Sequence, residues 1–312
     1  MGLDNGGKTS ILLLLNKRFS LLCTIKPTIK ANRNRTSVSI LGLDISSWDL
    51  GGQKNFREEY LKNKDKFFTH VQSLFFVIDV QKRERFEEAL IYLQDIVNTV
   101  LELNPNYAEI SKFTILFHKF DPDIAQNEEI LTNVKYLEEK IKLLHQGAKF
   151  SFFKTSIYDD ASLIRAFSEG AISITHKSKL IQNLLKEYTK TTFSSSAVFL
   201  DQQSFIIASR STKESYQEIC ESIAPRLAYA MERLEEWGID TVDIVTNIKF
   251  PQDKFENNRE GLIFLTKFDL KGDLKIERLY LITLCLNKKV KDKSYEYLPI
   301  LAKNLKNLLE SF

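Results

Sequence analysis

Hydrophobic and polar residues follow two alternating periods along the first 177 residues. The runs 73–80 and 112–117 are almost continuously apolar, which is typical of strands buried on both faces. Shorter strands are predicted at 36–41, 43–48 and 150–153. Amphipathic helices are predicted at 11–19, 57–71, 83–103, 128–145 and 161–174. Because strands alternate with helices, we predict an α/β domain with a mostly parallel, doubly wound sheet.

The pattern changes after about residue 178. Strands are predicted at 197–200, 205–208, 241–250, 261–269 and 275–286, the last two joined by a hairpin turn at 271–273. Helices are predicted at 179–188, 214–237 and 295–309, and Gly238 would end the long central helix. Meandering strands flanked by helices indicate a separate α+β domain. We therefore place one domain at 1–177 and a second at 178–312.

The segment 2–9 carries the pattern G-x-x-x-x-G-K-[ST], the signature of a phosphate-binding loop. Its glycines let successive N–H groups point at one centre and surround phosphate groups. Lys8 would reach the β- and γ-phosphates, the Thr9 hydroxyl would bind Mg²⁺, and the following helix would direct its positive end at the anion. The alternative is an ordinary glycine-rich turn. The predicted nucleotide contacts of this loop are Gly2, Asp4, Asn5, Gly6, Gly7, Lys8, Thr9 and Ser10.

Two downstream segments carry the residue types that phosphate hydrolysis needs. Thr28 lies in a polar stretch, 20–35, that we expect to be an irregular loop, and it could reach Mg²⁺ and the γ-phosphate. Asp49 follows an apolar strand, where the aspartate of a P-loop enzyme meets the Mg²⁺ shell. Gly52 could donate its N–H to the γ-phosphate and Gln53 could orient the attacking water. The alternatives are a surface threonine and a simple Gly-Gly turn.

A third segment, 118–121, closes a predicted buried strand, at the sheet edge where ligands bind in α/β proteins. Asp121 could accept two hydrogen bonds from the N1 and N2 groups of guanine, which adenine cannot supply, and Lys119 could lie along the ring. Ser156 and Ile157 follow the next strand and could contact the base through backbone groups. The alternative is a solvated lysine and a capping aspartate before Pro122.

Composition narrows the possibilities further. The chain has 312 residues and a formal charge of +3, which gives no reason to expect a nucleic-acid partner. The basic cluster 287–291 is predicted to be a solvated loop. Three cysteines and four histidines show no metal or redox spacing, as in a cytosolic protein with reduced thiols. No apolar run approaches the roughly 20 residues that cross a bilayer, and Gly6 breaks a myristoylation motif at Met1-Gly2.

Together these motifs resemble the small GTPases, and more narrowly the Rag/Gtr family. The phosphate loop 2–10 also looks like that of Arf and Arf-like GTPases, and Trp48-Asp49-Leu50-Gly51-Gly52-Gln53 is shared by both. His118 in an H-K-x-D base motif is the Rag form, and 153–159 is similar to the Rag segment F-x-T-S-I-W-D. Arf proteins end after the G domain, whereas 180–209 looks like the start of the roadblock (longin-like) domain of Rag proteins.

The resemblance implies an α/β P-loop GTPase domain followed by an α+β roadblock or longin-like domain. It implies a switch that binds GTP or GDP with Mg²⁺, hydrolyses GTP slowly, and dimerises through the second domain. Exchange factors, activating proteins and adaptor proteins would be its partners. We expect a cytoplasmic protein without a lipid anchor, reaching an internal membrane only through partners. His118 in place of asparagine removes the amide that ties the base loop to the phosphate loop.

In small GTPases a central strand leads into the phosphate loop, and here the sequence begins at the loop. Without that strand, backbone groups of the sheet would lack partners, at about 1–3 kcal/mol each when buried. Either Met1 is an internal residue of a longer protein, which we favour, or the chain is truncated and binds nucleotide poorly.

Three other functions remain open at this point. The chain could be a non-catalytic interaction protein, or an Arf-like GTPase with an appended domain. A P-loop ATPase or kinase is the third, although Asp121 and its motif would have no purpose there.

Overall fold

The computed structural model describes residues 1–15, 32–40, 43–69, 71, 73–103, 112–172, 176–250, 260–269 and 278–310. The chain forms two compact units. The first consists of Met1–Val38 with Asp44–Ile174, and the second of Ser39–Leu43 with Thr175–Phe312.

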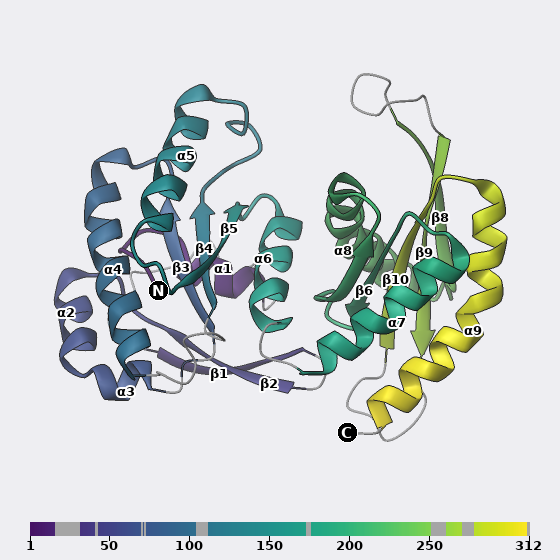
Figure 1. Ribbon diagram of the computed structural model, residues 1–312, viewed down its shortest axis with the longest axis horizontal. Coiled ribbons are helices and arrows are strands. Elements are labelled where there is room, and N and C mark those ends of the chain that lie inside the picture. Colours follow the sequence, from purple (N-terminus) through teal and green to yellow (C-terminus); the bar gives the residue numbers. More distant parts are fainter. Residues whose placement is uncertain are drawn as a thin grey trace. The chain divides into compact units, whose positions relative to one another are not determined.

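Among the described residues of the first unit, three parallel strands form one sheet in the order β3-β4-β5. They are β3 (Ser73–Asp79), β4 (Lys112–His118) and β5 (Lys149–Thr155). The helices α4 (Phe86–Leu103) and α5 (Glu128–Lys142), which connect these strands, cover one face, and α1 (Lys8–Leu15) and α6 (Asp160–Ile172) cover the other (Figure 1). The predicted doubly wound α/β fold is therefore confirmed.

Side chains alternate along β3 between two hydrophobic clusters. Leu74, Phe76 and Ile78 pack into the cluster beneath α4 (Phe86–Leu103). Phe75 and Val77 pack into the cluster of the opposite face. This alternation gives the sheet its two helical layers.

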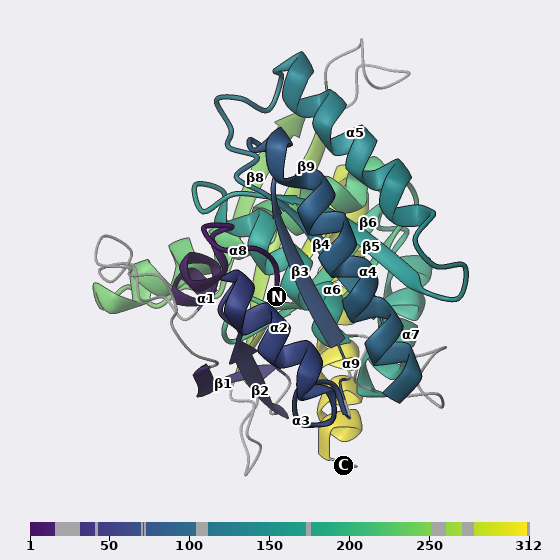
Figure 2. The same ribbon diagram turned by 90° about the vertical axis from the view of Figure 1, so that its left-hand side faces the viewer.

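Two helices, α1 (Lys8–Leu15) and α6 (Asp160–Ile172), form the layer that contacts Phe75 and Val77. The Phe75 ring stacks on Phe167 of α6 at a centroid distance of 4.3 Å. The other layer contains α4 and the elements α2 (Lys54–Lys62), α3 (Lys64–Phe68) and α5 (Glu128–Lys142). Figure 2 views the first unit from the side of this layer.

The place beside β3 is partly taken by the first two residues of the sequence. The Met1 amino group donates to the Phe75 carbonyl at 2.6 Å, and the Val77 N–H donates to the Met1 carbonyl at 2.9 Å. Gly2 forms a parallel bridge with Val77. Part of this edge of β3 is therefore paired, whereas the sequence predicted that no strand lies here.

Several predicted boundaries were wrong. The strand β1 (Asn32–Ile40) begins four residues earlier than predicted, inside the segment expected to be an irregular loop, and pairs with β2 (Leu43–Asp49). The helix predicted at 57–71 is two helices, because the backbone of Asn63 leaves the helical region at φ −104° and ψ 44°. Thr28 and the hairpin turn predicted at 271–273 lie outside the described residues.

The described strands of the second unit form an antiparallel sheet in the order β7-β6-β10-β9-β8. These strands are β6 (Ser196–Asp201), β7 (Ile206–Ser211), β8 (Asp243–Lys249), β9 (Glu260–Asp269) and β10 (Arg278–Cys285). The helix α8 (Glu214–Glu236) covers one face, where Val198, Ile263 and Ile282 are buried. The helices α7 (His176–Thr192) and α9 (Lys288–Glu310) pack together on the other (Figure 1).

The ends of two helices bear on the predictions for this unit. Gly238, at φ +77°, donates to the Glu235 carbonyl at 2.8 Å, which confirms it as the residue that ends α8. The basic cluster 287–291 was predicted to be a solvated loop, but α9 begins at Lys288. Val290 and Tyr295 pack on Leu262 and Phe264. This apolar contact holds the start of α9 against the sheet, and the lysine-rich sequence did not indicate it.

Cys220 and Cys285 are buried free thiols, and burial raises their pKa values to about 12 and about 11. Cys23 lies outside the described residues. Across the described part of the chain, no helix combines the length and apolar character needed to span a bilayer.

Candidate nucleotide-binding site

The phosphate-loop segment turns sharply at three residues with positive φ, namely Gly2 at 130°, Asn5 at 58° and Gly7 at 89°. A Cβ on Gly2 would lie 2.3 Å from the Val77 carbonyl oxygen. Only glycine fits there, because the backbone of the loop lies directly against β3. The loop is therefore fixed to the strand at its beginning.

The helix α1 begins at Lys8, three residues earlier than predicted, and its first backbone bond runs from the Ile11 N–H to the Gly7 carbonyl at 3.0 Å. Thr9 and Ser10 lie half-buried in the first turn. The Lys8 ammonium group reaches back across the loop and donates to the Leu3 carbonyl at 2.6 Å. The loop, the lysine and a helix N-terminus thus form one compact turn with the geometry of an anion site.

The turn 50–53 packs against the phosphate loop. The Asp4 N–H donates to the Gly52 carbonyl at 3.2 Å. A Cβ on Gly52 would lie 2.2 Å from the Asp4 nitrogen, so a side chain at this position would separate the two segments. Gln53 is the N-cap residue of α2, and its exposed side chain makes no capping hydrogen bond. Asp49 ends β2 next to this turn.

The base loop, which starts with residues 118–121 at the end of β4, is held by the last residue of β3 and by residues that follow β3 and β5. The Lys119 ammonium donates to Asp79 at 2.6 Å, with Lys119 itself at φ +60°. The Asp121 carboxylate accepts from the Ser156 hydroxyl at 2.5 Å and from the Gln81 amide at 3.3 Å. Asp121 and Ser156, which sequence reasoning placed in one site, are therefore in direct contact. Ile157 follows them, half-buried.

His118 connects the base loop with the phosphate loop. Its side chain is 2% exposed, and Nδ1 lies 3.1 Å from the Thr155 hydroxyl. A Cβ on Gly7 would lie 2.6 Å from Cδ2 of the ring. Burial, helped by the nearby Lys119 charge, lowers the pKa of His118 to about 4. The ring is therefore neutral at physiological pH, because burying a charged imidazolium at this position would be unfavourable in free energy.

Sequence reasoning missed three residues that position this site. Asp79 holds Lys119, Gln81 holds Asp121 and the Lys119 carbonyl, and Arg85 donates to Asp4 at 2.7 Å. A signal existed for Asp79 and Gln81, because polar residues that follow the carboxyl end of a parallel strand meet at one sheet edge. Arg85 had no such signal.

The described residues therefore bring together the phosphate loop, the turn 50–53 and the base loop at the carboxyl edge of β3, β4 and β5. They contain no cluster of three or more His, Cys, Asp or Glu residues that would hold a metal by itself. Thr28 lies outside the described residues. The phosphate loop and Asp121 therefore lie at the same edge of the sheet.

A family model described as the Gtr1/RagA G protein conserved region matches residues 1–229. The Ras-related GTP-binding protein A of Dictyostelium discoideum is 25% identical over 221 residues, covering 70% of this chain and 71% of the relative. The GTP-binding protein gtr1 of Schizosaccharomyces pombe is 26% identical over 219 residues, covering 69% and 68%.

Among solved structures, the chain is similar to the Arl6 BBS3 small GTPase of Trypanosoma brucei with a bound nucleotide analogue. The sequence identity is 20% and the TM-score 0.40, and the match covers 55% of this chain and 91% of that one.

Proposed function

The chain belongs to the Gtr1/RagA family of G proteins, and on this premise we propose that it is a molecular switch that binds GTP and GDP and slowly hydrolyses GTP. The observation that carries the proposal is the meeting of three loops. The phosphate loop contacts the turn 50–53 through Asp4 and Gly52, and it contacts the base loop through Gly7 and His118. A nucleotide needs these three parts within reach of one another.

The phosphate groups would bind to the backbone N–H groups of residues 5–10, at the start of α1. Gly2, Asp4, Gly6 and Gly7 give the loop its shape, and Lys8 would exchange its contact with the Leu3 carbonyl for the β- and γ-phosphates. Gly52 would turn its N–H toward the γ-phosphate. The N-terminus of α1 favours the negative charge of these groups.

Mg²⁺ would be held by Thr9, Thr28 and Asp49 together with the phosphates. Hydroxyl and carboxylate oxygens are ligands that this ion prefers, and the ion usually keeps several waters and phosphate oxygens as well. Because water and phosphate oxygens would supply the remaining ligands, the site does not need a metal-binding cluster of acidic side chains, and the described residues contain none. When bound, the ion would neutralise charge on the β- and γ-phosphates.

Guanine would be read by Asp121. Each carboxylate oxygen accepts one hydrogen bond in the structure, from Ser156 and from Gln81, and each has a further lone pair for the N1 and N2 groups of the base. Lys119, held by Asp79, would lie along the ring, and Ser156 and Ile157 would offer backbone groups. Adenine lacks this donor pair, so the site would discriminate against ATP.

Hydrolysis requires a water to attack the γ-phosphorus while the bond to the β-phosphate oxygen breaks. Gln53 would orient that water through its side-chain amide. Its exposed position at the start of α2, without a capping hydrogen bond, leaves the amide available for this role.

The second unit would dimerise, with a second copy or a related chain. β8 is an edge strand of the described sheet, and three apolar residues of the segment between α8 and β8 are at least half exposed: Trp237, Ile239 and Val242. Exposed apolar groups beside an open strand edge favour association. Exchange factors, activating proteins and adaptor proteins would act on this cytoplasmic dimer, and membrane contact would come through them.

Single-turnover hydrolysis tests the proposal. We expect Gln53→Leu to bind GTP as tightly as the wild type and to release phosphate at least about tenfold more slowly. Equal hydrolysis by both proteins would rule out the role of Gln53. A wild-type protein that binds GTP without hydrolysing it would instead favour a non-catalytic interaction protein.

A further inference from the structure

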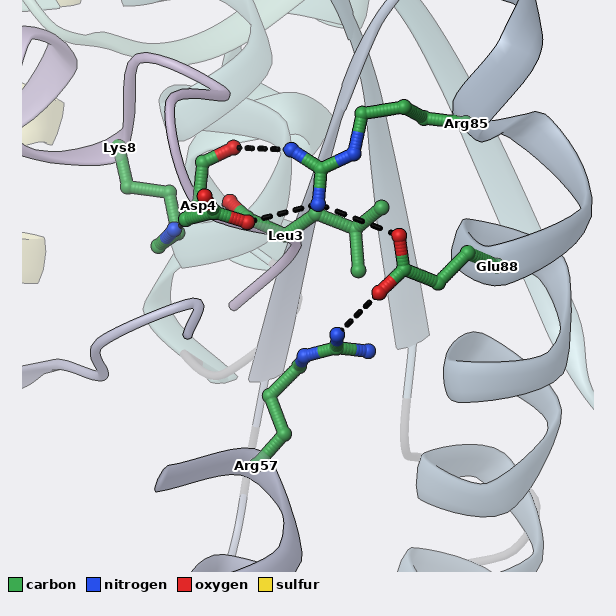
Figure 3. Close-up of polar contacts among 6 residues, drawn as sticks. All are labelled: Leu3, Asp4, Lys8, Arg57, Arg85 and Glu88. Carbon is green, nitrogen blue, oxygen red and sulfur yellow. Dashed lines mark hydrogen bonds and ion pairs between the residues drawn. The ribbon is translucent and has the colours of Figure 1, made fainter. Parts of the chain in front are cut away.

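A chain of charged side chains connects the phosphate loop with α2 by way of α4 (Figure 3). Arg85 donates through Nη1 to the Asp4 carbonyl at 3.0 Å and through Nη2 to the Asp4 carboxylate at 2.7 Å. Arg85 Nη2 also donates to Glu88 at 3.2 Å. The second oxygen of Glu88 accepts a hydrogen bond from Arg57 of α2. Glu88 is therefore shared by two guanidinium groups.

The acidic and basic side chains of this network stabilise one another's charged forms. Partial burial opposes the ionisation of Asp4 and Glu88, but hydrogen bonds and charge from the arginines outweigh it and lower both pKa values. The pKa of Arg85 is raised by the same partners, against a partial burial that would lower it. Asp4, Glu88 and Arg85 therefore stay charged at physiological pH, and the contacts among them persist there.

Arg57 extends the connection to Gln53. The Arg57 N–H donates to the Gln53 carbonyl at 3.0 Å within the first turn of α2. The Arg57 side chain is 10% exposed, and its guanidinium carbon lies 5.1 Å from the centre of the Tyr92 ring. Because Arg57 is held both by its backbone N–H and by its side chain, it holds the first turn of α2 in place.

The connection closes into a ring. From Gln53 the backbone leads to Gly52, whose carbonyl accepts from the Asp4 N–H at 3.2 Å. Asp4 is thus held by three hydrogen bonds. The Asp4 N–H donates to the Gly52 carbonyl, and the Asp4 carbonyl and carboxylate both accept from Arg85. Gln53 is tied to the phosphate loop by two separate routes, a direct one through Gly52 and an indirect one through Arg57, Glu88 and Arg85.

We propose that Arg85, Glu88 and Arg57 are positioning residues that set the place of Gln53 relative to the phosphate loop. This inference rests on the proposed GTP hydrolysis and adds to it the residues that align its catalytic glutamine. Neither Glu88 nor Arg57 belongs to the predicted phosphate, Mg²⁺ or guanine contacts. Breaking the ring at these two residues leaves the Asp4–Arg85 contact in place, so the catalytic step should suffer more than binding.

The experiment compares wild type with Glu88→Gln, Arg57→Met and the double variant, in the full chain with Mg²⁺. GDP and GTP dissociation constants are measured by fluorescence, and the hydrolysis rate by single-turnover phosphate release. We expect dissociation constants within about threefold of wild type and hydrolysis at least about tenfold slower, because small misplacements of catalytic groups cost this much or more. The double variant should be no slower than the slower single variant, because both changes break the same link.

Two further variants make the result specific. Glu84→Gln removes an equal charge from an exposed residue just before α4 and should hydrolyse GTP at the wild-type rate. Arg85→Lys keeps the charge but cannot reach the Asp4 carbonyl, the Asp4 carboxylate and Glu88 together, so it should hydrolyse GTP more slowly than wild type. Thermal unfolding checks that each variant is folded.

Hydrolysis at the wild-type rate in both single variants would overturn the inference and leave the proposed function standing. Equal losses in binding and in hydrolysis would also overturn it, since the residues would then serve the fold of the loop. A wild-type protein that neither binds nor hydrolyses GTP would overturn the proposed function and this inference together.

Discussion

The His118 ring lies so close to Gly7 that a Cβ on Gly7 would come within 2.6 Å of its Cδ2 atom. The base loop and the phosphate loop therefore touch through packing at the position where most small GTPases have an asparagine. The ring is anchored on its other side, with Nδ1 3.1 Å from the Thr155 hydroxyl. Loss of the asparagine amide thus leaves the two loops in contact, although sequence reasoning expected the tie to be gone.

Burial of His118 predicts a loss of stability in mild acid. The pKa is about 4 in the folded protein and near its ordinary value of 6.5 when unfolded, so between these values the unfolded chain binds more protons. The stabilising contribution is complete above pH 6.5 and is lost as pH falls toward 4. Between pH 7 and pH 5 we expect a loss of about 2 kcal/mol in the free energy of unfolding.

Urea unfolding at several pH values measures this loss, and His118→Asn is the matched variant because its side chain does not titrate. The difference in unfolding free energy between wild type and variant should change with pH across this window. Parallel curves would show that His118 carries no such linkage.

Asp121→Asn should change which base the site accepts. Loss of the carboxylate removes two charged hydrogen bonds to guanine, each worth about 1.5–3 kcal/mol, so GDP affinity should fall by at least roughly 100-fold. A xanthine nucleotide, which has a carbonyl where guanine has its amino group, should bind the variant better than the wild type. Competition against a fluorescent nucleotide measures both changes. Asp123→Asn, an exposed aspartate of the same loop, is the control and should behave as wild type.

Gln81→Ala should weaken nucleotide binding although Gln81 belongs to no recognised motif. Its amide donates to the Lys119 carbonyl at 2.8 Å and to Asp121 at 3.3 Å, so its removal frees the base loop. We expect roughly fivefold to tenfold faster GDP dissociation, which corresponds to about 1 kcal/mol. Gln126→Ala makes the same chemical change at an exposed position of the loop. Identical dissociation rates in all three proteins would show that Gln81 does not hold Asp121.

Trp237→Glu should prevent dimerisation of the second unit. Trp237 is 69% exposed, close in sequence to the edge strand β8, and a charge there would disrupt an apolar contact. Phe193 is equally exposed at 69%, so Phe193→Glu is the matched control. Light scattering after size-exclusion chromatography should give a dimer for the wild type and the control and a monomer for Trp237→Glu. A wild-type monomer at micromolar concentration would contradict the proposed dimer.

The local motifs of the site were predictable because their physics is local. A phosphate loop needs glycines and a lysine at fixed spacing, so residues 2–9 identify it without any tertiary information. The apolar runs at 73–80 and 112–117 identified the buried strands for the same reason. The partners that hold these motifs were not predictable in this way. Arg85 meets Asp4 across 81 residues, and Lys119 meets Asp79 across 40.

Two element boundaries were predicted wrongly, one because of tertiary packing and one because of a local hydrogen bond. The lysines before Ser294 suggested a loop, yet Val290 and Tyr295 pack on β9 and extend α9 to Lys288. The helix after Gln53 was predicted without its break, because asparagine at position 63 is a weak signal until its amide is seen to donate to the Glu59 carbonyl at 2.9 Å. The first error arose because the apolar partners of Val290 and Tyr295 are distant in sequence, and the second because hydrophobic periodicity does not reveal a local side-chain hydrogen bond.

Binding of a fluorescent guanine nucleotide tests the central claim most directly. The full chain, with Mg²⁺, is titrated with labelled GDP and then with unlabelled GTP, GDP or excess ATP, alongside Lys8→Ala. We expect saturable binding that GTP and GDP displace, that ATP does not displace, and that Lys8→Ala greatly weakens. Absence of binding in the wild type, or displacement by ATP as effective as that by GTP, would contradict the claim.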